Sequence, residues 1–268
     1  MRTLFDKKHQ NKKIVAISCH TAPISNICSK YADILLVGDT VGMTLYGHKD
    51  TKNVTVEMMK NHGAAVVSAA ESNNYTIIDM PFGSYEKDKE KALKNAQYLL
   101  KSTQADAIKL EGGTEIAETL KYLTEHKIPV VGHIGLLPQQ ISDSKDYRAQ
   151  GKELHQIDKI TNDLNLLLSL DIKIIVIECV YKELVDELIK NKDCIFIGIG
   201  ASENCDGQIL VADDIMGLTY KIKQPKFAKS YLDGKTIIES AIKEFSNDVR
   251  NKKFPSKENL YRQQNAKK

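Results

Sequence analysis

Residues 107–113 read Ala-Ile-Lys-Leu-Glu-Gly-Gly, a short apolar strand that carries a cation and a carboxylate and then runs into two glycines. Side chains two residues apart on a strand point to the same side, so Lys109 and Glu111 are expected to share one face. Glycines are expected at this point where a barrel strand opens into a ligand-binding loop. The stretch therefore predicts a charged site at the end of a buried strand.

Seven further β-branched runs resemble this strand, and most are separated by longer amphipathic segments. They are continuous apolar runs rather than alternating ones, which favours parallel strands covered on both faces. Repeated strand–helix units in 268 residues predict a single (β/α)8 TIM barrel over residues 1–268, with an open doubly wound sheet as the alternative. The predicted strands are residues 14–18, 34–37, 76–79, 107–111, 129–132, 172–178, 194–199 and 208–211.

Helices are predicted between these strands, and two segments fall outside the alternation. Residues 1–13 are expected to form an N-terminal helical extension that covers the bottom of the barrel. Residues 136–152 are predicted to be a long loop of the kind that acts as a lid, and the tail from about residue 251 is expected to be polar and frayed. The predicted helices are residues 55–68, 86–101, 115–126, 158–170 and 182–190.

Composition excludes several classes of protein. The net charge of +3 comes from scattered lysines without a basic, aromatic-rich stripe, which argues against nucleic-acid binding. No secretory signal is evident, and no apolar run approaches the ~20 residues that a membrane span needs. Five cysteines without CxxC spacing favour neither disulfides nor zinc. A cytoplasmic, reduced protein is expected.

Three acids follow or end apolar runs, namely Asp39, Asp79 and Glu111. Active sites of (β/α)8 barrels are built at the carboxyl ends of the strands. Each acid alone could be a loop cap. Together, converging carboxylates without cysteine or clustered histidine favour a hard divalent cation, most simply Mg²⁺.

Three more polar residues share this position at the end of a strand. Lys109 could neutralise Glu111, but beside a metal it is well placed to bind a substrate carboxylate. Glu178 ends the most apolar strand, where burial is expected to raise its pKa and suit it to act as a general base. His133 is either a buried structural histidine or a substrate contact.

These residues lie in motifs that resemble the ketopantoate hydroxymethyltransferase (3-methyl-2-oxobutanoate hydroxymethyltransferase) family. The resemblance extends from about residue 14 to residue 255, and the order and spacing of the motifs make it specific. The motifs are LVGDTVGMTLYGH (36–48), DMPFGSY (79–85), IKLEGG (108–113), VGHIGLLPQ (131–139), IECV (177–180), IGIGAS (197–202), DGQILV (206–211) and PKFAK (225–229).

The resemblance implies an activity, cofactors and an assembly. It implies transfer of a hydroxymethyl group from 5,10-methylenetetrahydrofolate to 3-methyl-2-oxobutanoate through a Mg-stabilised enolate, in pantothenate biosynthesis. It also implies one Mg²⁺ per subunit and a homo-oligomer, typically a decamer. In position, Asp39, Asp79 and Glu111 match the metal-site acids, and Glu178 matches the proton acceptor. The groups that match the α-keto acid site are Asp39, Thr40, Asp79 and Lys109.

The chain departs from the family pattern at several positions around the barrel mouth. Thr40 replaces a usual Ser, Leu137 a usual Thr, and Ser202 a usual Gly. Ser18-Cys19-His20-Thr21 stands where TAYD is common, and Lys145-Asp146 where a Gly pair is common. These departures affect the expected folate contacts and turnover more than the type of reaction.

Two alternatives remain open from the sequence. One is a lyase or mutase of the phosphoenolpyruvate mutase and isocitrate lyase kind, although the KxCGH-like loop of those enzymes does not occur after the fourth strand. The other is a binding protein that keeps the ligand site without the activity.

Overall fold

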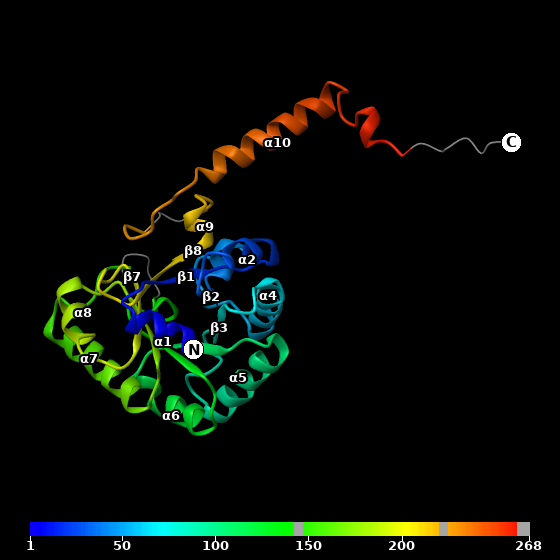
Figure 1. Cartoon of the computed structure of the whole chain (residues 1–268). Coiled ribbons are helices and arrows are strands. Elements are labelled where there is room, and N and C mark those ends of the chain that lie inside the picture. The colour runs from blue at the N-terminus through cyan, green and yellow to red at the C-terminus, as the bar shows by residue number, and fades with distance from the viewer. Residues whose placement is uncertain (142–146, 220–224, 262–268) are drawn as a thin grey trace.

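The structure describes residues 1–141, 147–219 and 225–261. In this part of the chain the strands form a closed barrel, in which they follow one another in the order of the sequence. All neighbours run parallel, and β8 pairs with β1 to complete the ring in this computed structural model (Figure 1). The predicted (β/α)8 barrel is confirmed. The strands are β1 Ile14–Ser18, β2 Ile34–Val37, β3 Tyr75–Asp79, β4 Ala107–Glu111, β5 Val130–Gly135, β6 Ile174–Glu178, β7 Ile195–Ile199 and β8 Gly207–Val211.

The barrel interior is apolar below and polar at the carboxyl ends of the strands. Small and branched side chains fill its lower part, among them Ala16, Ile77 and Ile197. Leu4 of the N-terminal helix α1 (Arg2–His9) belongs to the same buried cluster, and α1 contacts β1 and β7. The N-terminal segment therefore covers the bottom of the barrel, as predicted. The open end is left for the polar layer that forms the site.

The predicted helices are present, and most of their starts are shifted by a few residues. α5 begins at Lys89 rather than residue 86, because the Asp88 side chain accepts a hydrogen bond from the Lys91 amide at 2.9 Å. None of the described helices has the length and apolarity to cross a bilayer. The remaining helices are α2 Ala22–Cys28, α3 Val41–Thr44, α4 Val56–Ala69, α6 Ala117–Glu125, α7 Leu154–Ser169, α8 Lys182–Leu188, α9 Ala212–Ile215 and α10 Gly234–Arg250, with short 3-10 turns η1 Thr114–Ile116, η2 Pro138–Gln140 and η4 Lys257–Asn259.

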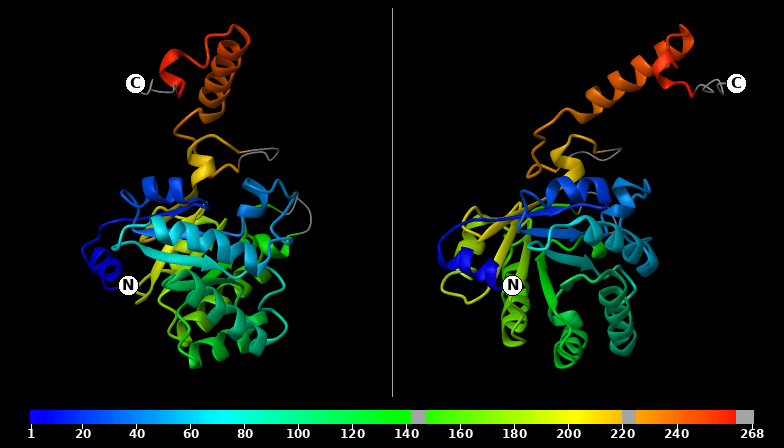
Figure 2. Two further views of the ribbon diagram at one scale, coloured as in Figure 1. Left: turned by 90° about the vertical axis from the view of Figure 1, so that its right-hand side faces the viewer. Right: turned by 45° about the vertical axis from the view of Figure 1, so that its right-hand side comes forward.

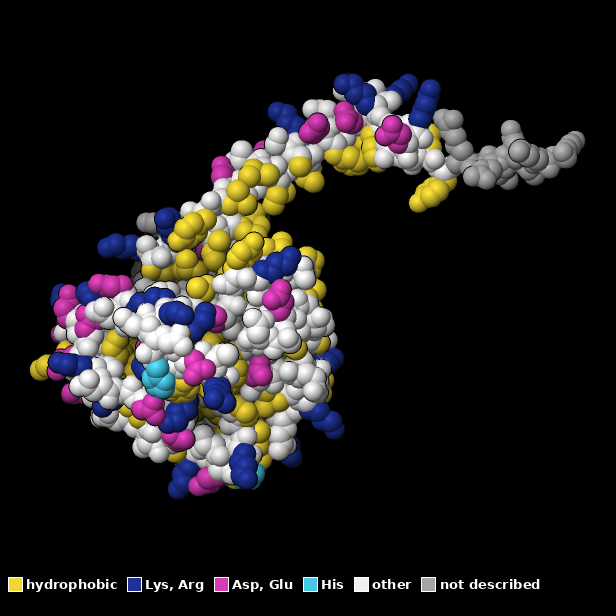
Figure 3. Space-filling view, viewed as in Figure 1, with side chains coloured by type: hydrophobic (Ala, Val, Ile, Leu, Met, Phe, Trp, Pro, Cys, Tyr) yellow, Lys and Arg dark blue, Asp and Glu magenta, His cyan; other side chains and the backbone are white. Residues whose placement is uncertain are grey.

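The helix α10, called the arm below, was not predicted. The chain leaves the barrel after the four-residue α9, and the arm projects away from the strands (Figures 1 and 2). Only Gly234 of the arm is buried. Figure 3 shows hydrophobic side chains gathered along one side of it. The exposed apolar side chains are Ile237, Ile238, Ile242, Phe245 and Val249.

Candidate active site

All seven predicted site residues lie at the carboxyl ends of barrel strands. Thr40 and Glu178 are partly exposed and the other five are buried. The strands carry them at successive positions around the ring: Asp39 and Thr40 after β2, Asp79 at the end of β3, Lys109 and Glu111 on β4, His133 on β5 and Glu178 at the end of β6. Strand ends far apart in the sequence thus bring these side chains to one mouth.

The register of the sheet determines which charges meet. Asp79 and Lys109 are paired positions of β3 and β4, and Glu111 and His133 are paired positions of β4 and β5. Lys109 Nζ lies 3.1 Å from Asp79 Oδ1, and both side chains are almost fully buried. Lys109 therefore forms its ion pair with Asp79 on the neighbouring strand rather than with Glu111.

His133 connects the lysine to the expected base. Lys109 Nζ lies 3.1 Å from His133 Nδ1, and His133 Nε2 lies 3.3 Å from Glu178 Oε2. A protonated lysine can only donate, so Nδ1 accepts and the ring proton lies on Nε2, facing Glu178. The buried His133 thus contacts both Lys109 and Glu178.

Gln139 is a site residue that sequence reasoning missed. Its Nε2 donates to Asp39 Oδ2 at 2.8 Å, and its backbone amide donates to Glu111 Oε2 at 2.9 Å. Tyr85 OH donates to Gln139 Oε1 at 2.6 Å and so fixes the amide. The sequence signal that points to Gln139 is its place as the polar last residue of the motif VGHIGLLPQ, at the start of the predicted loop. Gln139 holds two of the predicted metal-site acids in place.

Replacing Gln139 with Leu is expected to lower the free energy of unfolding by about 1–3 kcal/mol, because Asp39 Oδ2 and Tyr85 OH lose a buried hydrogen-bond partner. Urea unfolding measures the change. The matched control is Gln140→Leu, since Gln140 is exposed and its side chain donates to the Glu115 side chain at 3.1 Å, away from the acids of the site. Equal losses of stability in both variants would show that the hydrogen bonds of the Gln139 side chain to Asp39 and Tyr85 do not stabilise the fold.

Negative charge exceeds positive charge in the buried cluster. Burial is the main cause that raises the pKa of Asp39 well above its ordinary value, and Asp79 and Glu111 add to it. Burial also raises the pKa of Asp79, although Lys109 opposes this. Burial alone would lower the pKa of Lys109, but Asp79 and Glu111 outweigh it, so the pKa rises and the ammonium stays charged. A cation would relieve the remaining repulsion.

The acids fit a hard cation that also has outside ligands. Asp79 Oδ1 is buried and lies 3.1 Å from Lys109 Nζ, so this one cation offsets one of the three buried carboxylates. Carboxylate oxygens are ligands that Mg²⁺ accepts, usually with several waters in its shell. No three His, Cys, Asp or Glu side chains of the described chain are arranged to hold an ion by themselves. An ion bound here would therefore need water or substrate oxygens to complete its shell.

His20, one of the departures from the family pattern, contacts the site directly. Its Nε2 lies 3.2 Å from Thr40 Oγ1, and its Nδ1 lies 3.6 Å from Asp213 Oδ2. The ring therefore orients the hydroxyl that replaces the usual serine. Ser202 instead donates to Asp186 of α8, away from the acids, and Lys145 and Asp146 lie outside the described residues.

Sequence comparisons agree on one family. The model of the family described as ketopantoate hydroxymethyltransferase matches residues 1–257. The 3-methyl-2-oxobutanoate hydroxymethyltransferase of Rhizobium etli is 41% identical over 251 residues, covering 94% of this chain and 91% of that protein. The protein of the same name from Paramagnetospirillum magneticum is 41% identical over 248 residues, covering 92% of this chain and 90% of its own.

Similar solved structures share the barrel at low sequence identity. A phosphonopyruvate hydrolase, solved in complex with oxalate and Mg²⁺, matches with a TM-score of 0.60 at 9% identity, covering 96% of this chain and 92% of that one. A 2,3-dimethylmalate lyase of the PEP mutase/isocitrate lyase superfamily matches with a TM-score of 0.54 at 14% identity, covering 93% of this chain and 84% of that one. At these identities the likeness concerns the fold.

Proposed function

Since the chain belongs to the ketopantoate hydroxymethyltransferase family and is therefore a transferase, we propose that it transfers a hydroxymethyl group from 5,10-methylenetetrahydrofolate to 3-methyl-2-oxobutanoate. The products are 2-dehydropantoate and tetrahydrofolate, and one water is consumed. The supporting observation is that a buried lysine, a histidine and several carboxylates meet at one barrel mouth. The proposal places the reaction in pantothenate biosynthesis in the cytoplasm.

We propose that one Mg²⁺ per subunit binds to Asp39, Asp79 and Glu111, directly or through water. When bound, the ion polarises the keto group and stabilises negative charge on its oxygen. The excess negative charge of the cluster, three buried carboxylates beside one lysine, supports this role.

The chain's own residues have distinct roles in the proposed reaction. Lys109 and the Thr40 hydroxyl orient the carboxylate of the keto acid. Glu178 accepts the proton from C3 and leaves an enolate. Water cleaves both C–N bonds of the folate methylene group and releases its carbon as formaldehyde, while the two nitrogens take up the protons. The enolate carbon then adds to the formaldehyde carbon, whose oxygen is protonated to give the hydroxymethyl group. His133 Nε2 lies 3.3 Å from one oxygen of Glu178, and the other oxygen is left for the proton. Glu178 is suited to this because its side chain is 13% exposed, the most open of the ion-paired groups here.

Exchange of the C3 proton tests this function without the folate. In D₂O with Mg²⁺, the C3 proton of 3-methyl-2-oxobutanoate should exchange, as followed by NMR, and EDTA should stop the exchange. Adding methylenetetrahydrofolate should then yield 2-dehydropantoate. Binding of the keto acid without any exchange would favour the binding-protein alternative.

We also propose that the protein assembles into a homo-oligomer, a decamer by family resemblance, in which the arm packs on a second copy. The five apolar side chains of the arm are each 45–64% exposed. Most helices in proteins owe their stability to packing of such a face. On the barrel itself, the four-residue α9 follows β8, and the outward side chains of Val15 on β1 and Gln208 on β8 are exposed. The arm of a second copy would cover this face.

Replacing Ile242 with Asp is expected to weaken self-association by roughly 100-fold, because burial of an Ile contributes about 1.5–3 kcal/mol and a charge would oppose docking. Light scattering after gel filtration, over a dilution series, measures the mass. Ser240→Asp, an equal charge on the same exposed helix, is the control and should leave the mass unchanged. Unchanged mass for Ile242→Asp at every dilution would remove the arm from the interface.

A further inference from the structure

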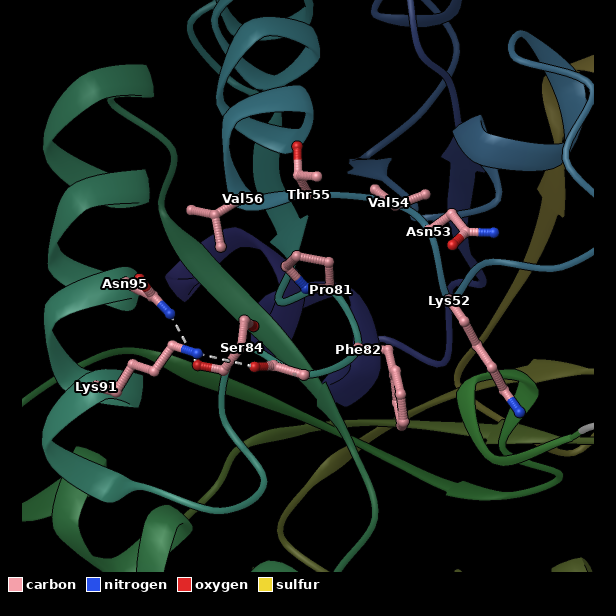
Figure 4. Close-up of a pocket in the computed structure, with 11 residues that line it drawn as sticks. Lys52, Asn53, Val54, Thr55, Val56, Pro81, Phe82, Ser84, Lys91 and Asn95 are labelled. Carbon is pink, nitrogen blue, oxygen red and sulfur yellow. Dashed lines mark hydrogen bonds between the residues drawn. The ribbon is translucent and has the colours of Figure 1, made fainter.

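A cavity, called the shoulder pocket, borders the loop that follows Asp79 and is not used by the proposed chemistry. It has a volume of about 440 Å³. Its walls are the loop 52–56 before and at the start of α4, the loop 81–84 after β3, and Lys91 and Asn95 of α5 (Figure 4). Three segments distant in the sequence thus form one hollow.

The lining of the shoulder pocket favours an anion. Lys52 and Lys91 line it, and no acidic side chain of the described residues does. Lys91 Nζ donates to the Gly83 carbonyl at 3.3 Å, which uses one of the three N–H donors of a lysine ammonium. The first turn of the 14-residue α4 also begins at the pocket, so its free amides add partial positive charge.

A buried polar group without a partner gives independent evidence for a ligand. Ser84 lines the pocket and is only 4% exposed. Its Oγ has no hydrogen-bond partner among the described residues. Buried hydroxyls are nearly always bonded in folded proteins. A ligand oxygen in the pocket would supply the missing partner. Asn95 Nδ2 donates to the Ser84 backbone carbonyl at 2.8 Å and so holds the Ser84 backbone in place.

The shoulder pocket shares its walls with the segments that carry the metal-site acids. Pro81 follows Asp79 by two residues, and the Met80 carbonyl between them accepts a hydrogen bond from Gln139 Nε2 at 2.9 Å. On the other wall, Val54 packs closely over Gly42, since a Cβ added to Gly42 would lie 2.6 Å from Val54 Cγ2. The pocket therefore borders the loop that directly follows Asp79.

We propose that the shoulder pocket binds the carboxylates of the glutamyl end of the folate donor, through Lys91, Lys52 and the Ser84 hydroxyl. This assignment rests on the proposed function, because it takes the donor from there. A folate carries an aromatic body and a dicarboxylate end. Phe82, with Lys52 Nζ 5.8 Å from its ring centre, offers an apolar and cationic surface to such a molecule. A free dicarboxylate that regulates the enzyme would use the same chemistry.

The first test compares donors with and without the glutamyl group. Lys91→Met should raise KM for methylenetetrahydrofolate about tenfold, through loss of a charge-assisted contact, with kcat unchanged. The same variant should not change KM for methylenetetrahydropteroate, which lacks the glutamate. Lys94→Met, exposed on the same helix and outside the pocket, is the matched control and should behave as wild type. An equal KM increase for both donors would overturn the assignment.

Ser84→Ala gives a readout that a purely structural role would not produce. The variant should raise KM for the folate severalfold while the thermal midpoint stays at or above that of wild type, because the lost hydroxyl had no partner. A lowered midpoint with an unchanged KM would contradict the proposal.

Two further measurements separate the sources of the carboxylate and the two hypotheses. If glutarate alters turnover through Lys91 while KM for the folate stays unchanged in Lys91→Met, the pocket is an effector site and the donor assignment is wrong. Folate-independent C3 exchange should be the same in wild type and Lys91→Met. If exchange fails in wild type, the proposed function fails. Calorimetric titration of tetrahydrofolate into wild type and Lys91→Met then still tests the assignment of the shoulder pocket. About tenfold weaker binding to the variant supports the assignment, and equal binding overturns it.

Discussion

Glu178→Gln is expected to lower turnover by roughly 10²–10⁴-fold and to leave keto acid binding nearly intact. The amide cannot accept the C3 proton, but it has the size of the acid. Its oxygen can still lie beside His133 Nε2, which is 3.3 Å from Glu178 Oε2 in the wild type. The measurements are kcat for the full reaction and the rate of C3 exchange in D₂O.

The control for this variant is Glu187→Gln, a neutralised exposed acid on the following helix α8. It should turn over as the wild type does. Both full turnover and C3 exchange should fall together in Glu178→Gln, since one proton transfer limits both. Turnover close to the wild-type rate in Glu178→Gln would remove Glu178 from the role of base.

Lys109→Met is expected to lower the free energy of unfolding by about 3–5 kcal/mol, because it leaves Asp79 buried without its cation. The ion pair spans 3.1 Å, and both side chains are 4% exposed. Urea unfolding in EDTA, at one protein concentration, measures the loss without compensation by a bound cation. KM for the keto acid should also rise by roughly 10–100-fold, since a charge-assisted contact to its carboxylate is lost.

A double-mutant cycle checks the origin of this effect. Asp79→Asn combined with Lys109→Met should recover part of the stability, because both buried charges are then gone. Lys121→Met serves as the exposed control, since its partner Glu125 lies 3.9 Å away and both side chains are open to solvent. That change should stay within about 1 kcal/mol. Strict additivity in the cycle would show that Lys109 and Asp79 are not coupled.

The positions of the site residues could be predicted from the sequence because each ends an apolar run. The alternation of side chains along a strand placed Lys109 and Glu111 on one face, and the barrel brought Asp79 and Glu178 to the same mouth. Which charges pair could not be predicted, because that depends on the register between strands. Lys109 faces Asp79 because β3 and β4 pair those two positions.

Two features were missed for different physical reasons. Gln139 lies on a short 3-10 turn, and its contacts with Asp39 and Glu111 depend on how the loop folds back over the barrel. The arm has a clear helical repeat of apolar residues at 238, 242, 245 and 249. The strand–helix alternation that predicts the barrel ends at the eighth strand, so it does not predict the arm. His20 was noticed as a departure, but its contact with Thr40 required the structure.

In the proposed homo-oligomer, the exposed arm would make part of this protein's stability depend on its concentration. A helix that buries almost nothing in its own subunit gains its packing free energy only when subunits meet. By mass action, the thermal midpoint should then rise with total protein and fall on dilution, unlike that of a self-sufficient barrel. Newly made chains would carry an uncovered apolar helix until they find each other, so the encounter between subunits becomes the last step of folding.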